Sequence, residues 1–502
     1  MAKDAETLTR RHAPIDMSAP AFRSAGHALV DGIADWLDQI ADGPVTHDES
    51  PADVRRALRA DRPLPETGSD AEELLAEAAQ LLFRHSLFNG HPRFYGYITS
   101  SPAPIGALAD LLAAAVNQNV GAWRLAPIAT EIEAQTVRWI AEMIGFPTAT
   151  GGLLVSGGNM ANFVCFLAAR TAKVADVRAG GLRHAAAAPV FYASTEAHTW
   201  IQKAADLFGL GTDAVRWIRT DAQQRIDVAE MERQIVADRS AGALPFLVVG
   251  TAGTVSTGAV DPLAELAELC RRHDVWFHVD GAYGALAARV PGAPSALRAL
   301  SEADSVAVDP HKWLYAPLEA GCAMVRRRDD LLRTFSYHPS YYHFDHNVTN
   351  FFDYGPQNSR GFRALKVWLA LRQVGWSGYR QMIGDDMRLA AQLHASVQQH
   401  PEFEAMTQHL SISTFRYVPY GLQPSSPETE EYLARLNQEL LSRVERSGQA
   451  FLSNAMVDGR FALRACIVNF RTSVKDVEDL LPLLSRIGAE VDRELRPASS
   501  SA

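Results

Sequence analysis

Between residues 150 and 310, short apolar runs alternate with loops and helical runs, and this alternation constrains the fold more than any other feature of the chain. Helical runs at about 160–173 and 261–273 separate several of the apolar runs. This order is typical of a parallel sheet whose neighbouring strands are joined by crossover helices. We therefore predict an α/β fold with a mostly parallel, doubly wound sheet, and its expected strands are 153–155, 190–193, 246–249, 275–279 and 306–308.

The N-terminal part of the chain has a different pattern. Residues 21–41 carry apolar side chains at helical spacing, and a second amphipathic helix is expected at about 70–86. The Pro- and charge-rich stretch 51–67 between them is expected to be an irregular connector. Because these helices have an apolar face and little core of their own, we expect this arm to pack on a second subunit.

The C-terminal part of the chain contains fewer strands. A long helix is expected near 360–374, and a closing helix at about 475–494. Between them, strands are expected at 410–418, 450–456 and 461–469. This order predicts a second, smaller α/β domain.

The composition is that of a soluble globular enzyme. The chain has 502 residues, of which 47% are hydrophobic, and a formal net charge of −10, so nucleic acid is not an expected partner. The first residues lack the pattern of a secretory signal and no apolar run approaches membrane-spanning length, so we expect a cytoplasmic protein without a membrane partner. The four cysteines have no paired spacing, which indicates core packing rather than a zinc cluster or a disulfide framework.

Small, polar or ionisable residues follow each predicted strand, and the carboxyl ends of parallel strands meet at one edge of a sheet. Ser156–Asn159 follows the first strand and precedes a helix. Its backbone amides suit a phosphate, with a plain glycine turn as the alternative. His198 follows the second strand, and the third is followed by Gly250–Gly258, whose small residues let the backbone approach a ligand closely.

The fourth and fifth strands lead into ionisable side chains. The fourth ends at Asp280, a carboxylate that is costly to bury without a positive partner. Asp309, His311 and Lys312 follow the fifth strand. Because a lysine amine can lose its proton and condense with a carbonyl, Lys312 is a candidate Schiff-base residue, with an exposed basic side chain as the alternative.

These strand ends together predict one ligand. A phosphate cradle, a group that stacks on a ring, a carboxylate for a protonated ring nitrogen and a lysine for a carbonyl are what pyridoxal 5'-phosphate requires. The Asp280 carboxylate would keep the pyridine nitrogen protonated, so that the ring can accept electrons when a bond to the substrate Cα breaks.

Taken together, these residues resemble the group II pyridoxal-phosphate-dependent amino acid decarboxylases, a family that includes aromatic-L-amino-acid and glutamate decarboxylases. The resemblance runs from about residue 21 to residue 490, and its most specific motifs are His278–Tyr283 (His-Val-Asp-Gly-Ala-Tyr) and Pro310–Trp313 (Pro-His-Lys-Trp). It implies the fold-type-I architecture and a homodimer with the active site at the subunit interface. The expected divisions are an N-terminal helical arm for dimerisation (1–100), a large cofactor-binding domain (101–370) and a small C-terminal α/β domain (371–502).

The resemblance also implies roles for single residues. Lys312 would carry the cofactor, Asp280 would pair with its ring nitrogen, and His198 would stack over the ring. Members of the family have a mobile loop whose tyrosine returns a proton to the substrate carbon after carbon dioxide leaves, and Tyr341 fits this place. Phenylalanine there is associated with relatives that form an aldehyde. The predicted catalytic residues are Lys312, Tyr341, His198 and His311, and the predicted cofactor-binding residues are Lys312, Asp280, His198, Gly157, Gly158, Asn159, Thr254 and Asp309.

Two positions depart from the animal aromatic decarboxylases. Val255 stands where those enzymes have a threonine beside the ring hydroxyl, which removes a hydrogen bond. Asp309 stands where they have an asparagine near the phosphate. A carboxylate there would lie close to an anion, so Asp309 could instead hold His311 or a backbone amide.

The expected substrate contacts also follow from the resemblance. Residues 91–101 resemble the segment that lines the substrate pocket, and Asn119 and Gly121 of the other subunit would make that pocket roomier and more polar. Ser359 falls where plant relatives separate indolic from phenolic substrates. The predicted substrate is an aromatic L-amino acid (tryptophan, tyrosine, phenylalanine or dihydroxyphenylalanine), with glutamate, aspartate or a diamino acid as alternatives. The predicted substrate contacts are Tyr97, Ile98, Ser100, Asn119 and Ser359.

Other functions have less support in the sequence. A carbon–carbon lyase resembling sphingosine-phosphate lyase should lack both the Tyr341 loop and the N-terminal arm. The dinucleotide-like stretch Gly209–Ala214 follows a predicted helix and precedes a predicted strand, the reverse of the order that such a site requires. A non-catalytic regulator would not need both Asp280 and Lys312. We also expect no metal site, because the histidines of the Tyr341 loop (His338, His343 and His346) accompany tyrosines rather than acids.

Overall fold

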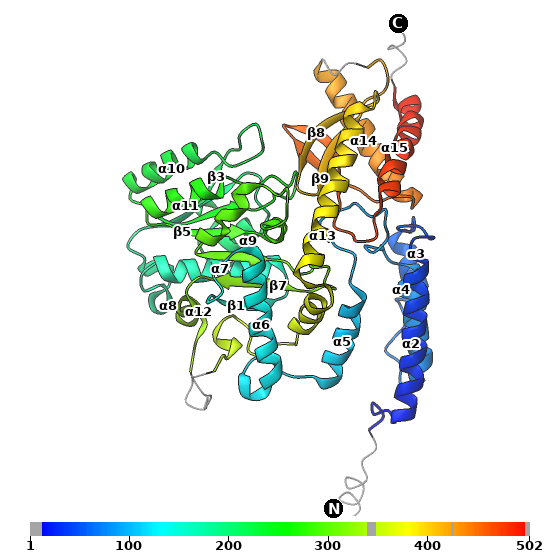
Figure 1. The fold of residues 1–502 in the computed structure, drawn as a ribbon, viewed down its shortest axis with the longest axis horizontal. Coiled ribbons are helices and arrows are strands. Elements are labelled where there is room, and N and C mark those ends of the chain that lie inside the picture. The colour runs from blue at the N-terminus through cyan, green and yellow to red at the C-terminus, as the bar shows by residue number, and fades with distance from the viewer. Residues whose placement is uncertain (1–12, 339–347, 423–425, 497–502) are drawn as a thin grey trace, which may run out of the picture.

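A seven-stranded sheet lies at the centre of the computed structural model, which describes residues 13–338, 348–422 and 426–496 (Figure 1). The strand order is β1-β7-β6-β5-β4-β2-β3. Strands β2 to β6 pair in parallel, whereas β7 is antiparallel to both β1 and β6. The strands are β1 (Gly151–Val155), β2 (Pro189–Ser194), β3 (Val215–Ile218), β4 (Leu244–Thr251), β5 (Trp276–Asp280), β6 (Ser305–Val308) and β7 (Gly321–Val325).

The predicted α/β fold with a mostly parallel sheet is confirmed, and the five expected strands correspond to β1, β2, β4, β5 and β6. Strand β7 was not expected. It follows β6 without a helix between them, and Gly321 and Ala323 are small residues that strands do not favour. Its antiparallel direction therefore lay outside the strand–helix alternation on which the prediction depended.

Helices cover both faces of this sheet. Leu153 and Val155 of β1 belong to the buried cluster that contains α7, whereas Leu154 points to the opposite face and joins the cluster that contains α6. Because both faces are buried, the strands consist of nearly continuous apolar runs. The covering helices are α6 (Pro127–Ile144), α7 (Gly158–Lys173), α8 (Val177–Gly180), α9 (Trp200–Leu207), α10 (Val228–Ser240), α11 (Leu263–Arg272) and α12 (Arg328–Phe335).

Short 3₁₀ helices connect several of these elements: η1 (Trp123–Leu125), η2 (Leu182–His184), η3 (Thr212–Ala214), η4 (Gly284–Ala287), η5 (Ser295–Glu302) and η6 (Phe351–Asp353).

All four cysteines are buried in the two apolar clusters and form no disulfide bond.

A second, antiparallel sheet has the order β10-β11-β9-β8. Strand β8 was not expected, because most of its side chains are only partly buried and its residues do not form an apolar run. Helices α14 (Pro427–Ser447) and α15 (Val474–Leu495) pack beside this sheet around a separate apolar cluster. The strands are β8 (Phe403–His409), β9 (Ile412–Tyr417), β10 (Ser453–Val457) and β11 (Arg460–Cys466).

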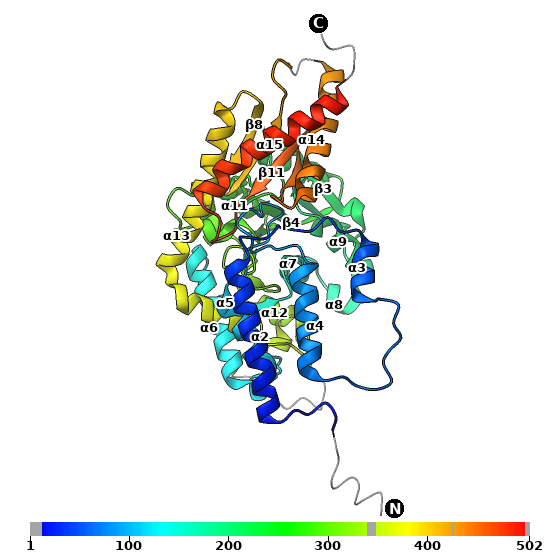
Figure 2. The same ribbon diagram turned by 90° about the vertical axis from the view of Figure 1, so that its right-hand side faces the viewer.

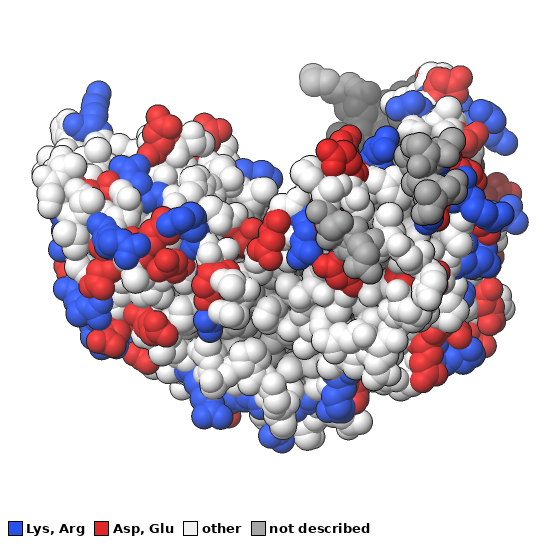
Figure 3. Space-filling model, turned by 90° about the horizontal axis from the view of Figure 1, so that it is seen from above, with Lys and Arg blue, Asp and Glu red and all other residues white. Residues whose placement is uncertain are grey.

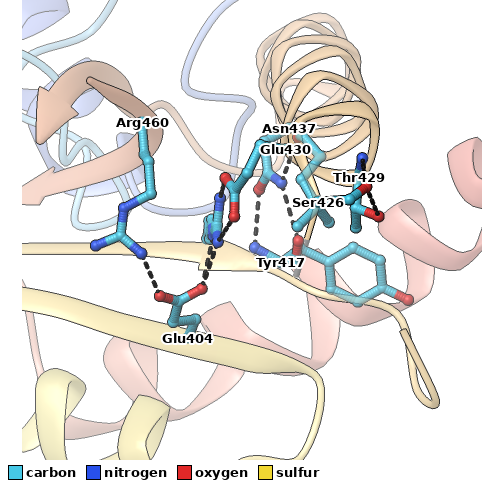
Figure 4. Close-up of polar contacts among 9 residues, drawn as sticks. Glu404, Tyr417, Ser426, Thr429, Glu430, Asn437 and Arg460 are labelled. Atoms are coloured by element: carbon cyan, nitrogen blue, oxygen red, sulfur yellow. Dashed lines mark hydrogen bonds and ion pairs between the residues drawn. The ribbon is translucent and has the colours of Figure 1, made fainter. Parts of the chain in front are cut away.

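Ion pairs fix α14 on this smaller sheet (Figure 4). The guanidinium of Arg416 on β9 is buried, and its Nε donates to Glu404 on β8 at 2.7 Å. Its Nη2 donates to Glu430, in the first turn of α14, at 3.0 Å. Arg460 on β11 donates to the other oxygen of Glu404 at 2.7 Å. Because a buried cation is stable only when it is paired, this network has a structural explanation and indicates no ligand.

The N-terminal arm is a helical pair beside the main body, in which α2 (Ala19–Gln39) and α4 (Ala71–Arg84) lie side by side (Figures 1 and 2). The rings of Trp36 and Phe83 stack between them at 5.2 Å. The expected irregular connector was wrong in part, because Pro51–Leu58 forms helix α3. Its Ser50 and Asp53 make a reciprocal capping box, which stabilises a short helix that the proline and charges had concealed.

Helix α13 (Ala364–Gln399) connects the two sheets and is far longer than the helix expected near 360–374. Gly375 breaks its helical geometry with a φ of +69°, so the chain bends and continues. The predicted division between residues 370 and 371 falls close to this bend. Helix α5 (Pro104–Val116) packs on α13.

Acidic and basic side chains are interspersed on the face seen from above, and neither kind predominates there (Figure 3). Within the described ranges, no helix combines the length and the apolar character that crossing a membrane requires.

Candidate active site

One pocket of about 400 Å³ is lined by residues from the carboxyl ends of β1, β2, β4, β5 and β6. The structure therefore brings together the strand ends that the sequence analysis singled out, including Lys312 and Asp280. The lining residues are Ile98, Ser156, Gly157, Gly158, Asn159, Asn162, His198, Thr251, Gly253, Val255, Asp280, Ala282, Tyr283, Asp309, His311 and Lys312.

A glycine turn, which immediately precedes α7, forms one wall of the pocket. Gly157 has a φ of +117°, and α7 begins at Gly158. A Cβ on Gly158 would lie 2.6 Å from Oδ2 of Asp309, so a side chain cannot be accommodated without displacing that carboxylate. The first backbone amides of a helix have no partners within the helix and favour an anion. This turn thus fits the phosphate of the predicted cofactor.

Asp280 lies at the end of β5 and is 8% exposed. Its Oδ2 accepts a hydrogen bond of 2.7 Å from Nε1 of Trp200, and its Oδ1 accepts one of 3.2 Å from the backbone amide of Ala282. Both donors are neutral, and no ion pair to Asp280 is formed within the described ranges. A protonated ring nitrogen would supply the positive partner that a buried carboxylate requires.

His198 lines the pocket from the loop after β2. Its Nδ1 accepts a hydrogen bond of 3.2 Å from the backbone amide of Trp200. Burial lowers the pKa of His198 below its ordinary value, and the charge of Asp280 opposes this effect only in part. The imidazole is therefore neutral near pH 7, and a flat neutral ring suits stacking on an aromatic cofactor.

Lys312 lies in the turn after β6, and its Nζ is 3.2 Å from Oδ2 of Asp309. The other oxygen of Asp309 is buried without a hydrogen-bond partner. Nε2 of His311 lies 3.6 Å from Oδ2 of Asp309, too far for a hydrogen bond, and Nδ1 of His311 contacts the carbonyl of Ala320 at 2.7 Å. Asp309 therefore holds the lysine amine rather than His311 or a backbone amide in this structure.

A buried carboxylate supports the lysine turn from behind. Oδ2 of Asp386 on α13 accepts hydrogen bonds from Nε1 of Trp313 at 2.9 Å and from the hydroxyl of Tyr315 at 2.7 Å. The Trp313 ring stacks on Tyr283, which lines the pocket, with the centroids 4.6 Å apart. Sequence analysis missed Asp386, because a single acid on a helix 74 residues after Lys312 gives no local signal of this contact.

Arg464 was also missed, although a charged residue inside the apolar strand predicted at 461–469 was a signal that could have identified it. Its side chain is buried, and Nη1 donates to the carbonyl of Tyr97 at 3.0 Å. Nε donates to the carbonyl of Ser256 at 3.2 Å, whereas Nη2 has no partner. Since Tyr97 and Ser256 adjoin the pocket residues Ile98 and Val255, Arg464 lies close behind the wall of the pocket.

Several predicted residues do not line this pocket. The hydroxyl of Thr254 contacts that of Thr257 at 3.0 Å within its own loop. Tyr97 is 58% exposed, and Ser100 donates to the carbonyl of His311 at 2.7 Å. Of the predicted substrate contacts, only Ile98 lines the pocket from the same chain.

The remaining predictions involve a second subunit or the region outside the described residues. Oδ1 of Asn119 accepts hydrogen bonds from the amides of Gly121 at 3.1 Å and Arg360 at 3.0 Å, and Ser359 is exposed. Neither Asn119 nor Ser359 lines the pocket of its own chain. Tyr341 lies outside the described residues, as do His343 and His346. Across the described ranges, no group of three His, Cys, Asp or Glu residues is placed to hold a metal ion.

The chain is similar to known decarboxylases over nearly its whole length. The family model described as the pyridoxal-dependent decarboxylase conserved domain matches residues 51–418. The aromatic-L-amino-acid decarboxylase of Bacillus atrophaeus is 34% identical over 482 residues, which cover 95% of this chain and 97% of that protein. Tryptophan decarboxylase 2 of Oryza sativa subsp. japonica is 30% identical over 93% of this chain and 94% of its own length. A phenylacetaldehyde synthase of Arabidopsis thaliana is 28% identical over 92% of this chain and 95% of that protein.

Solved structures are also similar to this chain over nearly its whole length. Mouse CSAD superposes with a TM-score of 0.89 at 26% identity, covering 94% of this chain and 99% of that one. The Oryza sativa TDC structure with PLP and tryptamine superposes with a TM-score of 0.88 at 27% identity, covering 96% of this chain and 99% of that one.

Proposed function

We propose that this chain, which belongs to the pyridoxal-dependent decarboxylase family, converts an aromatic L-amino acid to the corresponding amine and carbon dioxide. Its membership of the family makes it a pyridoxal-phosphate-dependent amino acid decarboxylase. The single observation that carries the proposal is the pocket in which Lys312, Asp280, His198 and the glycine turn face one another.

Different residues of the pocket would bind different parts of the cofactor. Lys312 would bind its aldehyde carbon, the amides that begin α7 would bind its phosphate, and Asp280 would keep its ring nitrogen protonated. Bound pyridoxal phosphate supplies a sink for the electron pair that remains on the substrate Cα when carbon dioxide leaves. Neutral His198 would cover one face of the ring and limit the access of water to it.

After carbon dioxide has left, the substrate Cα must receive a proton, and we propose that Tyr341 donates it. Tyrosine at this place supports a decarboxylase that releases an amine rather than an aldehyde. The similarity to a phenylacetaldehyde synthase makes an aldehyde synthase the second candidate. The two reactions are distinguished by their products, because the aldehyde forms with consumption of oxygen and release of peroxide and ammonia.

The aromatic substrate is supported by the relatives and by the pocket. Aromatic-L-amino-acid, tryptophan and tyrosine decarboxylases are among the proteins similar to the chain. Ile98 and Val255 form an apolar part of the pocket wall. Arg464, with an unpartnered Nη2 behind that wall, is our candidate for attracting the substrate carboxylate. Tyr97, Ser100, Asn119 and Ser359 stay predicted substrate contacts, the last two from the partner subunit.

We propose a homodimer with the active site at the subunit interface. Helix α5 exposes Leu108, Leu111, Leu112 and Val116, each more than half accessible to solvent. These positions form one stripe of the helix, and an apolar stripe of this kind indicates a partner surface. The arm helices α2 and α4 also expose apolar side chains, including Phe22 and Leu82. We expect L111E/L112E to be monomeric and inactive, whereas Val236→Glu, an equally exposed apolar position on α10, should leave the dimer intact.

We place the enzyme in the cytoplasm. Its four cysteines are buried and unpaired, and burial raises the pKa of the thiols of Cys165, Cys270, Cys322 and Cys466, which makes them unreactive. Such cysteines suit a reducing compartment.

A substrate panel tests the proposed function. Purified protein loaded with pyridoxal phosphate would be assayed for carbon dioxide release from the standard L-amino acids, dihydroxyphenylalanine and diamino acids. We expect the highest kcat/KM for an aromatic amino acid, with an amine as the product. A clear preference for glutamate, aspartate or a diamino acid would refute the aromatic assignment and leave the decarboxylase assignment intact.

A further inference from the structure

Trp200, the first residue of α9, makes a hydrogen bond to each of two side chains that face the pocket. Its indole Nε1 donates to Oδ2 of Asp280 at 2.7 Å. Its backbone amide donates to Nδ1 of His198 at 3.2 Å. One residue therefore orients both the carboxylate proposed to contact the ring nitrogen and the imidazole proposed to stack on the ring.

The indole is held in place by its surroundings. The side chain is buried, and its ring packs edge-on against His278, with the centroids 5.8 Å apart, and against Phe166 at 6.5 Å. Since a ring packed in this way has few alternative rotamers, the position of Nε1 is fixed before any ligand binds. The only other hydrogen bond to the side-chain carboxylate of Asp280 in the described part of the chain is the longer one, 3.2 Å, from the amide of Ala282.

A hydrogen bond donated to a carboxylate stabilises its charged form. The Trp200 indole donates to one oxygen of the Asp280 carboxylate, so it fixes the direction in which the other side of that carboxylate points. A carboxylate that stays charged leaves the shared proton on a ring nitrogen rather than drawing it back. Without the indole, Asp280 would compete more strongly for that proton and the ring would be a weaker electron acceptor.

We propose that Trp200 is a positioning residue that acts through Asp280 to favour the protonated form of the bound cofactor. This inference rests on the cofactor arrangement of the proposed function, and it adds a residue that the sequence motifs do not contain. A packing role alone would make the indole nitrogen irrelevant. A substitution at Trp200 tests the side chain alone. Every residue except proline keeps the backbone amide that donates to His198.

The test uses Trp200→Phe, which keeps an aromatic ring and the backbone amide and removes the indole donor. We expect its dissociation constant for pyridoxal phosphate, measured by fluorescence titration without substrate, to rise about tenfold or more. We also expect kcat to fall by a larger factor than KM changes. The matched control is Trp276→Phe, which removes another buried indole donor whose partner is the neutral hydroxyl of Ser305 at 2.9 Å. That control should change cofactor affinity about threefold at most.

A double-mutant cycle with Asp280→Asn separates coupling from packing. If Trp200 acts through Asp280, W200F should weaken cofactor binding far less in the D280N background than in the wild type. An equal loss in both backgrounds, or a loss no larger than that of W276F, would overturn the proposal. Should W200F fail to fold, Trp200→Leu replaces it in the same cycle, because leucine also lacks an N–H donor, and a coupling of zero would again overturn the proposal.

Failure of this inference and failure of the proposed function are distinguishable. Cofactor affinity is measured without an amino acid, so a protein that binds pyridoxal phosphate but decarboxylates no substrate refutes only the function. Wild-type cofactor affinity in W200F refutes only the role of Trp200.

Discussion

Nζ of Lys312 lies 3.2 Å from Oδ2 of Asp309, whose other oxygen is buried without a hydrogen-bond partner. The same Oδ2 occupies the space beside Gly158, at the turn that would bind the phosphate. In the proposed arrangement, Asp309 would lie beside the phosphate, and it engages the amine that would bind the cofactor.

Replacing Asp309 by asparagine should therefore strengthen cofactor binding. The change removes a like charge next to the phosphate and releases the Lys312 amine, and we expect affinity for pyridoxal phosphate to rise about three- to tenfold. The measurement is a cofactor titration. Asp274→Asn, which breaks the Lys173–Asp274 pair elsewhere on the molecule, is the control and should change nothing. A weaker affinity in D309N would show that the Asp309 carboxylate helps to hold the cofactor.

Replacing Tyr341 by phenylalanine tests the proton donor. Without the phenol, protonation of the Cα should slow and oxygen should compete for the electron-rich carbon, so aldehyde and peroxide should appear in place of part of the amine. Product analysis with an oxygen electrode measures the shift. Tyr342→Phe is the matched control, and full amine production by Y341F would reject the assignment.

Replacing Arg464 by glutamine tests the proposed carboxylate partner. We expect KM for the amino acid to rise by about tenfold or more, because an attraction between charged groups is lost. Inhibition by the product amine should stay unchanged, since the amine has no carboxylate. Arg460→Gln, on the same strand but paired with Glu404, is the control. If binding of the amine weakens as much as that of the amino acid, Arg464 has only a structural role.

Replacing Asp386 by asparagine should change how stability depends on pH. Burial raises the pKa of Asp386 to about 7, although hydrogen bonds from Tyr315 and Trp313 oppose the rise. Between about pH 4 and pH 7 the folded state keeps a proton that the unfolded chain releases, so this group lowers the free energy of unfolding as pH increases. D386N lacks this dependence. From pH 5 to pH 8 the wild type should lose on the order of 2–3 kcal/mol relative to D386N in denaturant unfolding. Parallel pH profiles would contradict this role of Asp386.

The sequence predicted the pocket because its residues come directly after strands. In a parallel sheet the position of a strand end follows from the order of elements, so Asp280, His198 and Lys312 could be placed at one edge without coordinates. The motifs around Asp280 and Lys312 were specific enough to predict the family as well.

The parts that the sequence did not predict depend on contacts between distant segments. Trp200 reaches Asp280 and Asp386 reaches Trp313 across 80 and 73 residues of sequence, and neither has a local pattern that reports its partner. Thr254 was predicted to bind the cofactor, but its hydroxyl group makes hydrogen bonds within its own loop, which depends on the turn between residues 254 and 259. The prediction from residue type alone could not include that turn.

The most direct test of the account is to identify the residue that holds the cofactor. The chain has six lysines, so reduction of the pyridoxal-phosphate-loaded protein with borohydride, followed by peptide mapping by mass spectrometry, can assign the attachment point without ambiguity. We predict that the cofactor is found on the peptide that contains Lys312, and that Lys312→Ala has neither the adduct nor activity. A stoichiometric adduct on another lysine, or wild-type turnover by K312A, would contradict the account.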